Sequence, residues 1–351
     1  MLFLNSHRAK SGRVGGQDLV DEFVLLAKFF GCGPLDRTGQ LEIGLDYKVL
    51  QELPEERTTD SFQDVCREVA DCIVDRAVAE DKEIQVTWSG GIDSTVALLS
   101  LQERLQNRGE MERLFVLLSL RSMTEYPRFY EQFIMQKLQT RALPVPLPNA
   151  LTADTITVTG EHGDQLFGSD HLAALVKGGV AHLPYREVIP FYMTSKLKLE
   201  SKARRLMDYL EPQVRSAPTK IETAFDYLWW CNFSLKWQQV GLRMVAFRGG
   251  QVRPLYENLV HFFGHRRFQS WSLSNPQVRK VRDWRAYKLQ AKQVILEATS
   301  DFDYFTKKEK EPSLKHVLVD RTAQGRDRYR VHMYDDFEVH CEVFDKSERP
   351  R

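Results

Sequence analysis

The residues best placed to do chemistry lie in a short turn, "SGGIDST", at residues 89–95. The turn follows a strand-like run, "EIQVTW", and leads into an apolar, helix-like run. The start of a helix presents unpaired backbone N–H groups and a partial positive charge, and glycine lets the backbone approach a phosphate closely. We therefore expect a phosphate cradle of amides and hydroxyls. Its members would be Ser89, Gly90, Gly91, Ser94 and Thr95.

Asp93 stands in the middle of this cradle. A phosphate would repel a carboxylate unless a cation lay between them, so the position of Asp93 implies Mg²⁺. The lysine that closes the kinase-type loop GxxxxGK[ST] is absent, which indicates a different kind of nucleotide site. The alternative is an ordinary strand–turn–helix junction that uses small residues for packing.

A second group of polar residues follows another strand-like run, in "TITVTGEHGDQLFGSD" at residues 155–170. In a parallel sheet the carboxyl ends of the strands meet at one edge, so Asp164 would face the same edge as Asp93. Two such carboxylates could share Mg²⁺ between the α-phosphate and the pyrophosphate of a nucleotide. The alternative is a polar turn in which Asp164 caps a helix.

These two strings resemble the motifs of a known superfamily. The first is similar to the S-G-G-x-D-S signature of the PP-loop ATP pyrophosphatases, which cleave ATP between its α- and β-phosphates. The second resembles the "SGEG-D-E-FGG" motif of the asparagine synthetase and β-lactam synthetase class. Matches fall at Gly160, Glu161, Gly163, Asp164, Phe167 and Gly168, and departures at His162, Gln165 and Ser169.

The resemblance implies roles for these residues. Asp93 and Asp164 would be the metal ligands, and Glu161 would orient the substrate. Gly160 would belong to the ATP site, and the backbone at Val86 and Leu118, on adjacent strand ends, would meet adenine.

Two weaker resemblances lie further along the chain. Residues 242–262 are similar to the family's "DRMSMAHGVEARVPFLD" stretch, with matches at Arg243, Met244, Arg253 and Pro254. Leu242 replaces its aspartate and Gly250 or Gln251 its glutamate, so the family's usual amino-acid substrate is not carried over. "YKLQAK" and "KKEKEPS" resemble elements that imply phosphate-binding roles for Lys288 and Lys310. The alternative for these lysines is a solvated basic helix face.

The surrounding pattern predicts an α/β fold with a doubly wound parallel sheet and a mostly helical C-terminal half. Strands are expected at residues 83–88, 113–120 and 155–160, and at 39–50 as a strand or hairpin arm; helices are expected at 19–30, about 61–80, 93–106, 126–139 and 224–247. The resemblance implies that this fold is of the adenine nucleotide α-hydrolase-like type. We expect a small N-terminal segment at 1–60, a PP-loop synthetase domain at 61–315 and a C-terminal β-hairpin and tail at 316–351.

Composition limits the partners and the cellular compartment that we expect for this protein. A formal net charge of +1 gives no general argument for nucleic acid or membrane partners, and no apolar run has the length of a membrane span. The five scattered cysteines favour a cytoplasmic protein. Cys66 and Cys72 are expected to be buried on a helix, which disfavours sulfur transfer.

The first residues bear on the nitrogen source. Relatives that use glutamine begin with a catalytic cysteine after the initiator methionine, whereas Leu2 stands here. We expect the nitrogen to come from free ammonia, from a substrate amine or from a separate ammonia-supplying or carrier protein. Residues 1–60 are a candidate remnant of the glutaminase domain.

Other features favour structural explanations. His261 and His265 have a helical i, i+4 spacing and are expected on a helix face rather than at a metal. Basic runs at 195–205 and 279–288 are expected to be solvated faces rather than a nucleic-acid surface. The tryptophans Trp229, Trp230 and Trp237 are expected in the core.

The sequence thus predicts an ATP-dependent, AMP-forming carbon–nitrogen ligase. A small-molecule carboxylate would be adenylated with release of pyrophosphate, and an amine or ammonia would then form the amide. Two alternatives stay open: a tRNA or DNA base-modifying enzyme that works through an adenylated intermediate, and a non-catalytic nucleotide-binding subunit.

Overall fold

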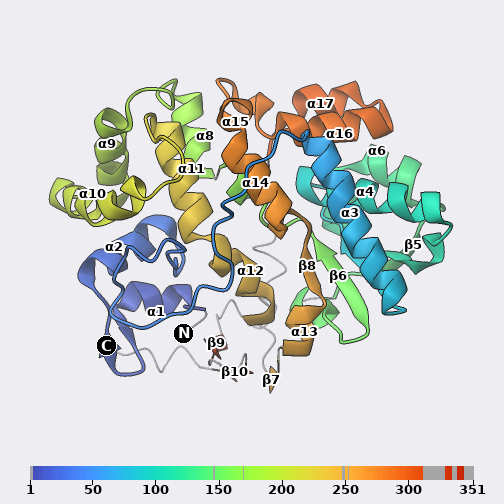
Figure 1. Cartoon of the computed structure of the whole chain (residues 1–351), viewed down its shortest axis with the longest axis horizontal. Coiled ribbons are helices and arrows are strands. Elements are labelled where there is room, and N and C mark those ends of the chain that lie inside the picture. Colours follow the sequence, from blue (N-terminus) through green and yellow to red (C-terminus); the bar gives the residue numbers. More distant parts are fainter. Residues whose placement is uncertain are drawn as a thin grey trace.

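A parallel sheet lies at the centre of the α/β architecture (Figure 1). The computed structural model describes residues 3–144, 147–168, 170–246, 250–251, 253–310, 329–333 and 338–343. The five strands run in the order β5-β4-β3-β6-β8, and every neighbouring pair is parallel. Their bounds are β3 Glu83–Thr87, β4 Leu114–Leu118, β5 Gln139–Ala142, β6 Thr155–Thr159 and β8 Leu259–His261.

The strand order defines where a ligand would bind. Chain order runs outward from β3 to β4 and β5 on one side, and from β6 to β8 on the other, so the direction reverses between β3 and β6. Open α/β sheets bind ligands at the carboxyl ends of the strands, at such a reversal. The glycine turn follows β3 and the "GEHGD" turn follows β6. Both motifs therefore lie at this point of the sheet.

Helices cover the sheet and form a second, helical part of the molecule. Figure 1 shows α3, α4 and α16 at one side and α8 to α11 at the other. The longer helices are α2 Asp21–Phe30, α3 Phe62–Ala79, α4 Ile92–Arg108, α8 Asp170–Lys177, α9 Tyr185–Leu197, α10 Glu200–Arg215, α11 Ala224–Leu235, α12 Trp237–Ala246, α14 Arg266–Ser274 and α16 Leu289–Thr299. Shorter pieces are α1 Ser6–Ser11, α5 Leu120–Glu125, α6 Pro127–Phe129, α7 Gly163–Phe167, α13 Arg253–Glu257, α15 Pro276–Arg279 and α17 Phe302–Lys307.

Most of the expected elements are present. The strands predicted at 83–88, 113–120 and 155–160 are present as β3, β4 and β6, and the helix predicted at 19–30 is present as α2. Helix α3 begins after Ser61, whose side chain accepts from the Asp64 amide while Asp64 reaches back to the Ser61 amide. This reciprocal capping box fixes the start of the helix that precedes the site.

Several expectations at the edges of the sheet were wrong. Residues 126–139 form α6 and a short π-helical turn, Tyr130–Ile134, and then enter strand β5 instead of continuing as one helix. All four residues of β5 are exposed, so no apolar pattern marks this edge strand in the sequence. Strand β8 has only three residues and was not predicted either.

Residues 39–50 do not form the expected strand or hairpin arm. Leu41 and Ile43 are buried as the alternation requires, and the Ile43 carbonyl accepts from the Val20 amide at 3.2 Å. The alternation therefore reflects packing of an irregular segment against the core rather than a sheet ladder.

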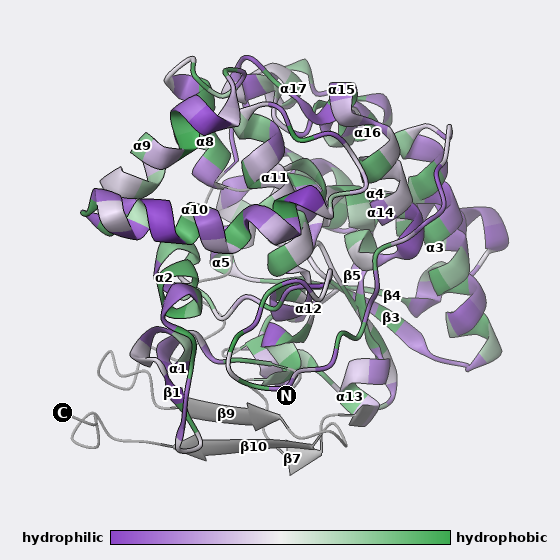
Figure 2. Ribbon diagram, turned by 60° about the vertical axis from the view of Figure 1, so that its left-hand side comes forward, coloured by the Kyte–Doolittle hydropathy of each residue, from purple (hydrophilic) through white to green (hydrophobic). Residues whose placement is uncertain are grey.

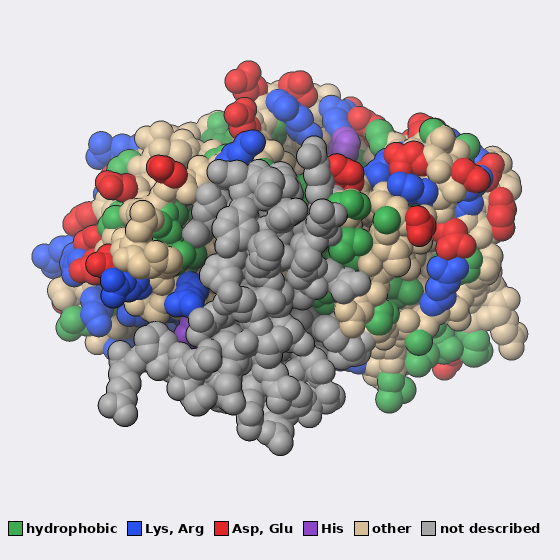
Figure 3. All heavy atoms as spheres, turned by 90° about the horizontal axis from the view of Figure 1, so that it is seen from below, with side chains coloured by type: hydrophobic (Ala, Val, Ile, Leu, Met, Phe, Trp, Pro, Cys, Tyr) green, Lys and Arg blue, Asp and Glu red, His purple; other side chains and the backbone are tan. Residues whose placement is uncertain are grey.

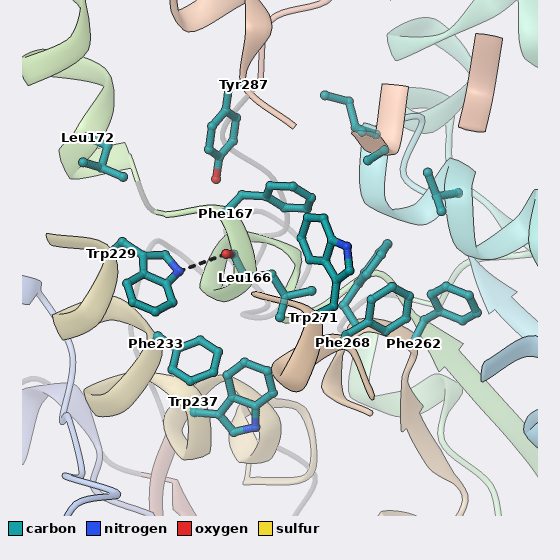
Figure 4. Close-up of a cluster of buried hydrophobic side chains, with 14 of the residues drawn as sticks. Leu166, Phe167, Leu172, Trp229, Phe233, Trp237, Phe262, Phe268, Trp271 and Tyr287 are labelled. Carbon is teal, nitrogen blue, oxygen red and sulfur yellow. Dashed lines mark hydrogen bonds between the residues drawn. The ribbon is translucent and has the colours of Figure 1, made fainter. Parts of the chain in front are cut away.

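The core is rich in aromatic side chains. Every residue of α11 is buried, and the expected core tryptophans, Trp229, Trp230 and Trp237, are at most 1% exposed. Figure 4 shows Leu166 and Phe167 of α7 among these rings, with the Trp229 indole donating to the Leu166 carbonyl at 2.9 Å. Helix α7, which follows the "GEH" turn, is thus anchored directly in the core.

A different hydropathy pattern marks α10. Figure 2 shows that hydrophilic and hydrophobic residues alternate along this helix, as in a surface helix.

The C-terminal region contains the expected pair of antiparallel strands. Strands β9 Tyr329–Met333 and β10 Glu338–Val343 pair with each other, and β10 also pairs with β7 Gly250–Gln251. Residues 311–328, the rest of the tail, the expected motif residue Ser169 and the side chain of Arg253 lie outside what the structure describes. Among the described residues, no helix combines the length and apolar character needed to cross a bilayer.

Candidate active site

The glycine turn is closed by hydroxyl hydrogen bonds. Ser94 Oγ accepts from the Ser89 amide at 3.0 Å and lies 2.9 Å from Ser89 Oγ, which itself accepts from the Gly91 amide. Gly90 has φ +79°, and a Cβ there would lie 2.5 Å from the Ser122 carbonyl oxygen. Glycine is therefore required here both by the backbone angle and by the close approach of α5.

The second motif packs directly on the first turn of α4. A Cβ on Gly160 would lie 2.7 Å from the Ser94 nitrogen, and one on Gly163 would overlap the Asp93 carboxyl group. These two glycines allow the chain after β6 to pass close to the chain after β3. The expected meeting of the two motifs at one sheet edge is confirmed by this contact.

One lysine joins the aspartates of the two motifs, and a second lysine pairs with one of them. Lys288 Nζ contacts Asp93 Oδ2 and lies 2.7 Å from Asp164 Oδ1. Lys310 Nζ lies 2.8 Å from Asp164 Oδ2. The Tyr287 hydroxyl donates to Asp164 Oδ1 at 3.2 Å. Side chains separated by up to 217 positions along the chain therefore form one charged cluster.

Burial and charge act differently on the two carboxyl groups. Burial raises the pKa of Asp93, Lys288 opposes that rise, and the nearby charge of Asp164 adds to it. Burial also acts to raise the pKa of Asp164, but Lys288 and Lys310 outweigh it and hold that pKa below its usual value. Asp164 is thus the carboxylate that stays ionised most readily.

Two further ion pairs line the same space. Lys308 Nζ lies 3.0 Å from Glu125 Oε1, and both side chains are largely buried. Arg243 contacts both carboxylate oxygens of Glu161 through one guanidinium nitrogen, while its Nε is buried and has no hydrogen-bond partner among the described residues. Sequence reasoning missed Glu125 and Lys308. Lys308 could have been suspected from the run of lysines around Lys310, but nothing in "SMTEYP" marks Glu125.

These groups surround one cavity of about 110 Å³. Its lining includes most of the residues expected in the site: Ser89, Gly91, Asp93, Ser94, Gly160, Glu161, Asp164, Lys288 and Lys310. It also includes Thr87, Glu125, His162, Gln165, Arg243 and Lys308, which had no predicted role in nucleotide binding.

Four expected nucleotide-binding residues lie outside this lining. Val86 is fully buried, and the Leu118 carbonyl already accepts from the Leu143 amide at 2.7 Å. Gly90 forms the turn against α5 and is not part of the lining. Thr95 is buried, where its hydroxyl donates to the Gly91 carbonyl at 2.8 Å and accepts from the Trp88 indole at 3.0 Å. Thr87, at the end of β3, lines the cavity in place of Val86.

The donor set fits a magnesium ion carried in by phosphate. Asp93 Oδ1 is buried without a hydrogen-bond partner among the described residues, and Asp164 lies on the other side of the Lys288 ammonium. The described residues contain no group of three or more His, Cys, Asp and Glu side chains arranged around a metal position. Mg²⁺ commonly binds through one or two carboxylates together with phosphate oxygens and water. Asp93 and Asp164 are the residues that would hold it.

Several expectations about charged and polar side chains were wrong. Within the basic run at 279–288, Arg279 and Lys288 are at most 2% exposed while Arg282 and Arg285 are exposed, so the run is only in part a solvated face. His261 ends strand β8 and His265 precedes α14, so they do not share a helix face. Cys66 is buried as expected, but Cys72 is exposed.

Comparison of the chain with models of known protein families, with curated proteins and with solved structures finds no significant match.

Proposed function

We propose that this protein is an ATP-dependent ligase of the PP-loop, asparagine synthetase-like kind, which adenylates a carboxylate and passes the acyl group to an amine or ammonia. One observation carries the proposal. Two aspartates from separate motifs meet at the sheet reversal, beside a glycine turn, with Lys288 and Lys310 in contact with them.

The first step needs positive charge around a leaving pyrophosphate. An oxygen of the substrate carboxylate attacks the α-phosphorus, and the bond from that phosphorus to pyrophosphate breaks. Ser89, Gly91 and Ser94 line the cavity, and their hydroxyls and amides would bind phosphate oxygens in exchange for their hydrogen bonds to one another. Lys288 and Lys310 can follow the charge that develops on the leaving group, because lysine is a mobile point charge.

A magnesium ion held by Asp93 and Asp164 would supply further positive charge to the phosphates when bound. The two lysines neutralise these carboxylates in the structure. Pairing each acid with an ammonium group keeps like charges from facing one another at a buried site.

The second step forms the amide. The amine nitrogen attacks the acyl carbon, the bond from that carbon to AMP breaks, and the nitrogen loses a proton. Arg243 supports a carboxylate as the first substrate, because its side chain lines the cavity and is 29% exposed, so that an incoming carboxylate could pair with the guanidinium group. Glu161, which holds the other side of that guanidinium, would then orient both groups.

The decisive experiment is ATP–pyrophosphate exchange against a panel of carboxylic acids. We expect exchange that depends on Mg²⁺ and on one class of acid, and formation of AMP when an amine is added. A matched Asp164→Asn variant should lose exchange while it keeps a wild-type far-UV circular dichroism spectrum. Formation of ADP in place of AMP, or exchange unchanged in Asp164→Asn, would contradict the proposal.

A further inference from the structure

Lys292 is a fully buried lysine of α16 that the proposed mechanism does not use. Its exposed fraction is 0%, although lysine is almost never fully buried without partners. The Lys292 ammonium group donates to two backbone carbonyls, that of Arg285 at 2.7 Å and that of Lys308. The two acceptors lie on separate segments, so this side chain joins them.

The contacts of Lys292 connect the two stretches of chain that carry the cavity lysines. Its own amide donates to the Lys288 carbonyl at 2.9 Å, within the first turn of α16. Lys308, whose carbonyl it holds, directly follows α17 and lines the cavity with its side chain. Two residues further on, Lys310 lies 2.8 Å from Asp164. Lys292 is not part of the cavity lining, so it can act on this site only through these neighbours.

Other contacts hold the stretch around α17 at different points. Asp301 caps the start of this helix and accepts from the Tyr126 hydroxyl at 3.1 Å. Beyond the helix, Glu309 pairs with Lys177 through side chains that are 43% and 57% exposed, and a surface pair of this kind contributes little. The buried ammonium group of Lys292 is therefore a firmer anchor near the cavity than this surface pair.

The charge of Lys292 strengthens the two hydrogen bonds. Burial lowers its pKa to about 8, the charges of Glu309 and Asp283 oppose that fall, and Lys308 adds to it. The side chain is therefore mostly protonated at pH 7. Hydrogen bonds from a charged donor are about twice as strong as those from a neutral one.

We propose that Lys292 is a positioning residue of this site, which holds Lys310 beside Asp164 through the Lys308 carbonyl. The proposal rests on the proposed ligase function for the ligand that Lys310 meets, the pyrophosphate part of ATP. A lysine that must follow charge onto a leaving group needs a backbone that stays in place while its side chain moves.

The test is a double-mutant cycle on binding of Mg²⁺–pyrophosphate to the full chain, measured by calorimetry. Lys292→Met keeps a long, unbranched side chain and removes its N–H donors. We expect it to weaken binding about tenfold in the otherwise unchanged protein and less than about twofold in the Lys310→Met background, because the two residues act as one unit. A role in overall stability alone would weaken binding by the same factor in both backgrounds, and that result would overturn the proposal.

Hydrogen exchange without any ligand tests the anchor independently of the ligase function. In Lys292→Met, peptides that cover residues 302–310 should exchange about tenfold faster than in the wild type, while peptides of α3 keep their rate. Lys280→Met is the matched control, because Lys280 pairs with Asp226 instead and should leave residues 302–310 unchanged. An unchanged rate at 302–310 in Lys292→Met would overturn the proposal.

If Lys292→Met does not fold, labelling of the wild-type protein with acetic anhydride decides the matter. Binding and anchoring are reciprocal, so Mg²⁺–pyrophosphate should slow acetylation of Lys292 about tenfold and leave that of Lys280 unchanged. Equal acetylation of Lys292 with and without the ligand would overturn the anchor even if ATP–pyrophosphate exchange were found. Faster hydrogen exchange at 302–310 in a Lys292→Met protein whose wild type binds no pyrophosphate would support the anchor and count against the ligase.

Discussion

At the scale of single residues, Lys288 is the side chain that links the two carboxylates of the site. It is 2% exposed and contacts the carboxylates of both Asp93 and Asp164. Its conformation is also unusual, with φ +59° at the residue that precedes α16. In the proposed mechanism, this buried cation would stabilise the charge that develops on the leaving pyrophosphate.

We predict that Lys288→Met lowers the rate of ATP–pyrophosphate exchange by about 10²–10³-fold, the usual effect of losing one preorganised charge partner in a transition state. Lys280→Met is the matched control, because Lys280 also pairs with a buried aspartate, Asp226, but lies outside the cavity lining. Exchange rates per folded molecule measure the difference. Equal rates in the two variants would remove Lys288 from the mechanism.

The sequence could predict the two aspartates but not all of their partners. Asp93 and Asp164 each follow a strand, so the rule for parallel sheets places them at one edge. Lys288 and Lys310 could be suspected only through the family resemblance, because no local pattern shows that a distant lysine folds back onto a strand end. Glu125 and Lys308 pair across 183 positions; the lysines around Lys310 give Lys308 a weak local signal, and Glu125 has none.

At the scale of elements, the site depends on how closely the chain after β6 approaches α4. Gly160→Ala would place a methyl group 2.7 Å from the Ser94 nitrogen and 2.9 Å from the Asp93 carbonyl carbon, both of which belong to backbone. We predict that this variant loses ATP binding at least tenfold, because the first turn of α4 must move. Isothermal titration calorimetry with Mg²⁺–ATP is the measurement.

Gly109→Ala is the control for this substitution. Gly109 has φ +72° with no atom within 4 Å of an added Cβ, so alanine there costs about 1 kcal/mol of stability through backbone strain alone. ATP affinity should stay at the wild-type value. A loss of affinity in Gly109→Ala as large as that in Gly160→Ala would show that the effect is general destabilisation.

We expect Asp226, in the first turn of α11, to make the free energy of unfolding depend on pH. Burial acts to raise the pKa of Asp226, but its hydrogen bonds with Lys280 and Thr223 outweigh burial and lower it. A carboxyl whose folded pKa lies below its unfolded value of about 3.9 stabilises the fold above that value, and the contribution disappears as pH falls through the folded pKa. The stabilisation is therefore present at pH 7 and lost in acid.

We predict that Asp226→Asn lowers the free energy of unfolding by about 3 kcal/mol at pH 7, as expected when one member of a buried ion pair is removed. The gap between variant and wild type should narrow as the pH is lowered from 5 toward 3. Urea unfolding at each pH measures it. A gap that stays constant over this range would show that the charge of Asp226 contributes nothing.

At the scale of the whole molecule, surface charge does not favour the nucleic-acid alternative. On the described part of the face in Figure 3, lysine and arginine side chains are interspersed with aspartate and glutamate. Within the basic run at 195–205, Arg204 pairs with Glu200 and Arg205 pairs with Glu22. Ion pairing of this kind reduces the positive potential that attracts a phosphate backbone.

The N-terminal segment shares one core with the rest of the chain. Phe23 and Leu26 belong to the same buried cluster as Leu210 and Ile295. Arg37, 6% exposed, donates to the Gln51 carbonyl at 2.8 Å, the Glu52 carbonyl at 2.9 Å and the Gln269 side chain at 2.5 Å. Its guanidinium also lies 4.7 Å from the Trp237 ring centroid. Residues before 60 thus contact both α12 and α14.

We predict that this segment unfolds together with the helical core. Amides of α2 and α11 should exchange with deuterium at the same free energy of opening, and Arg37→Met should lower both values by about 3 kcal/mol, because buried acceptors lose their donor. Arg13→Met, at an exposed ion pair with Asp18, should change either value by no more than about 0.5 kcal/mol. Hydrogen exchange with mass spectrometry resolves the two helices separately. If α2 opened at a lower free energy that Arg37→Met left unchanged, residues 1–60 would be an appendage rather than part of the common core.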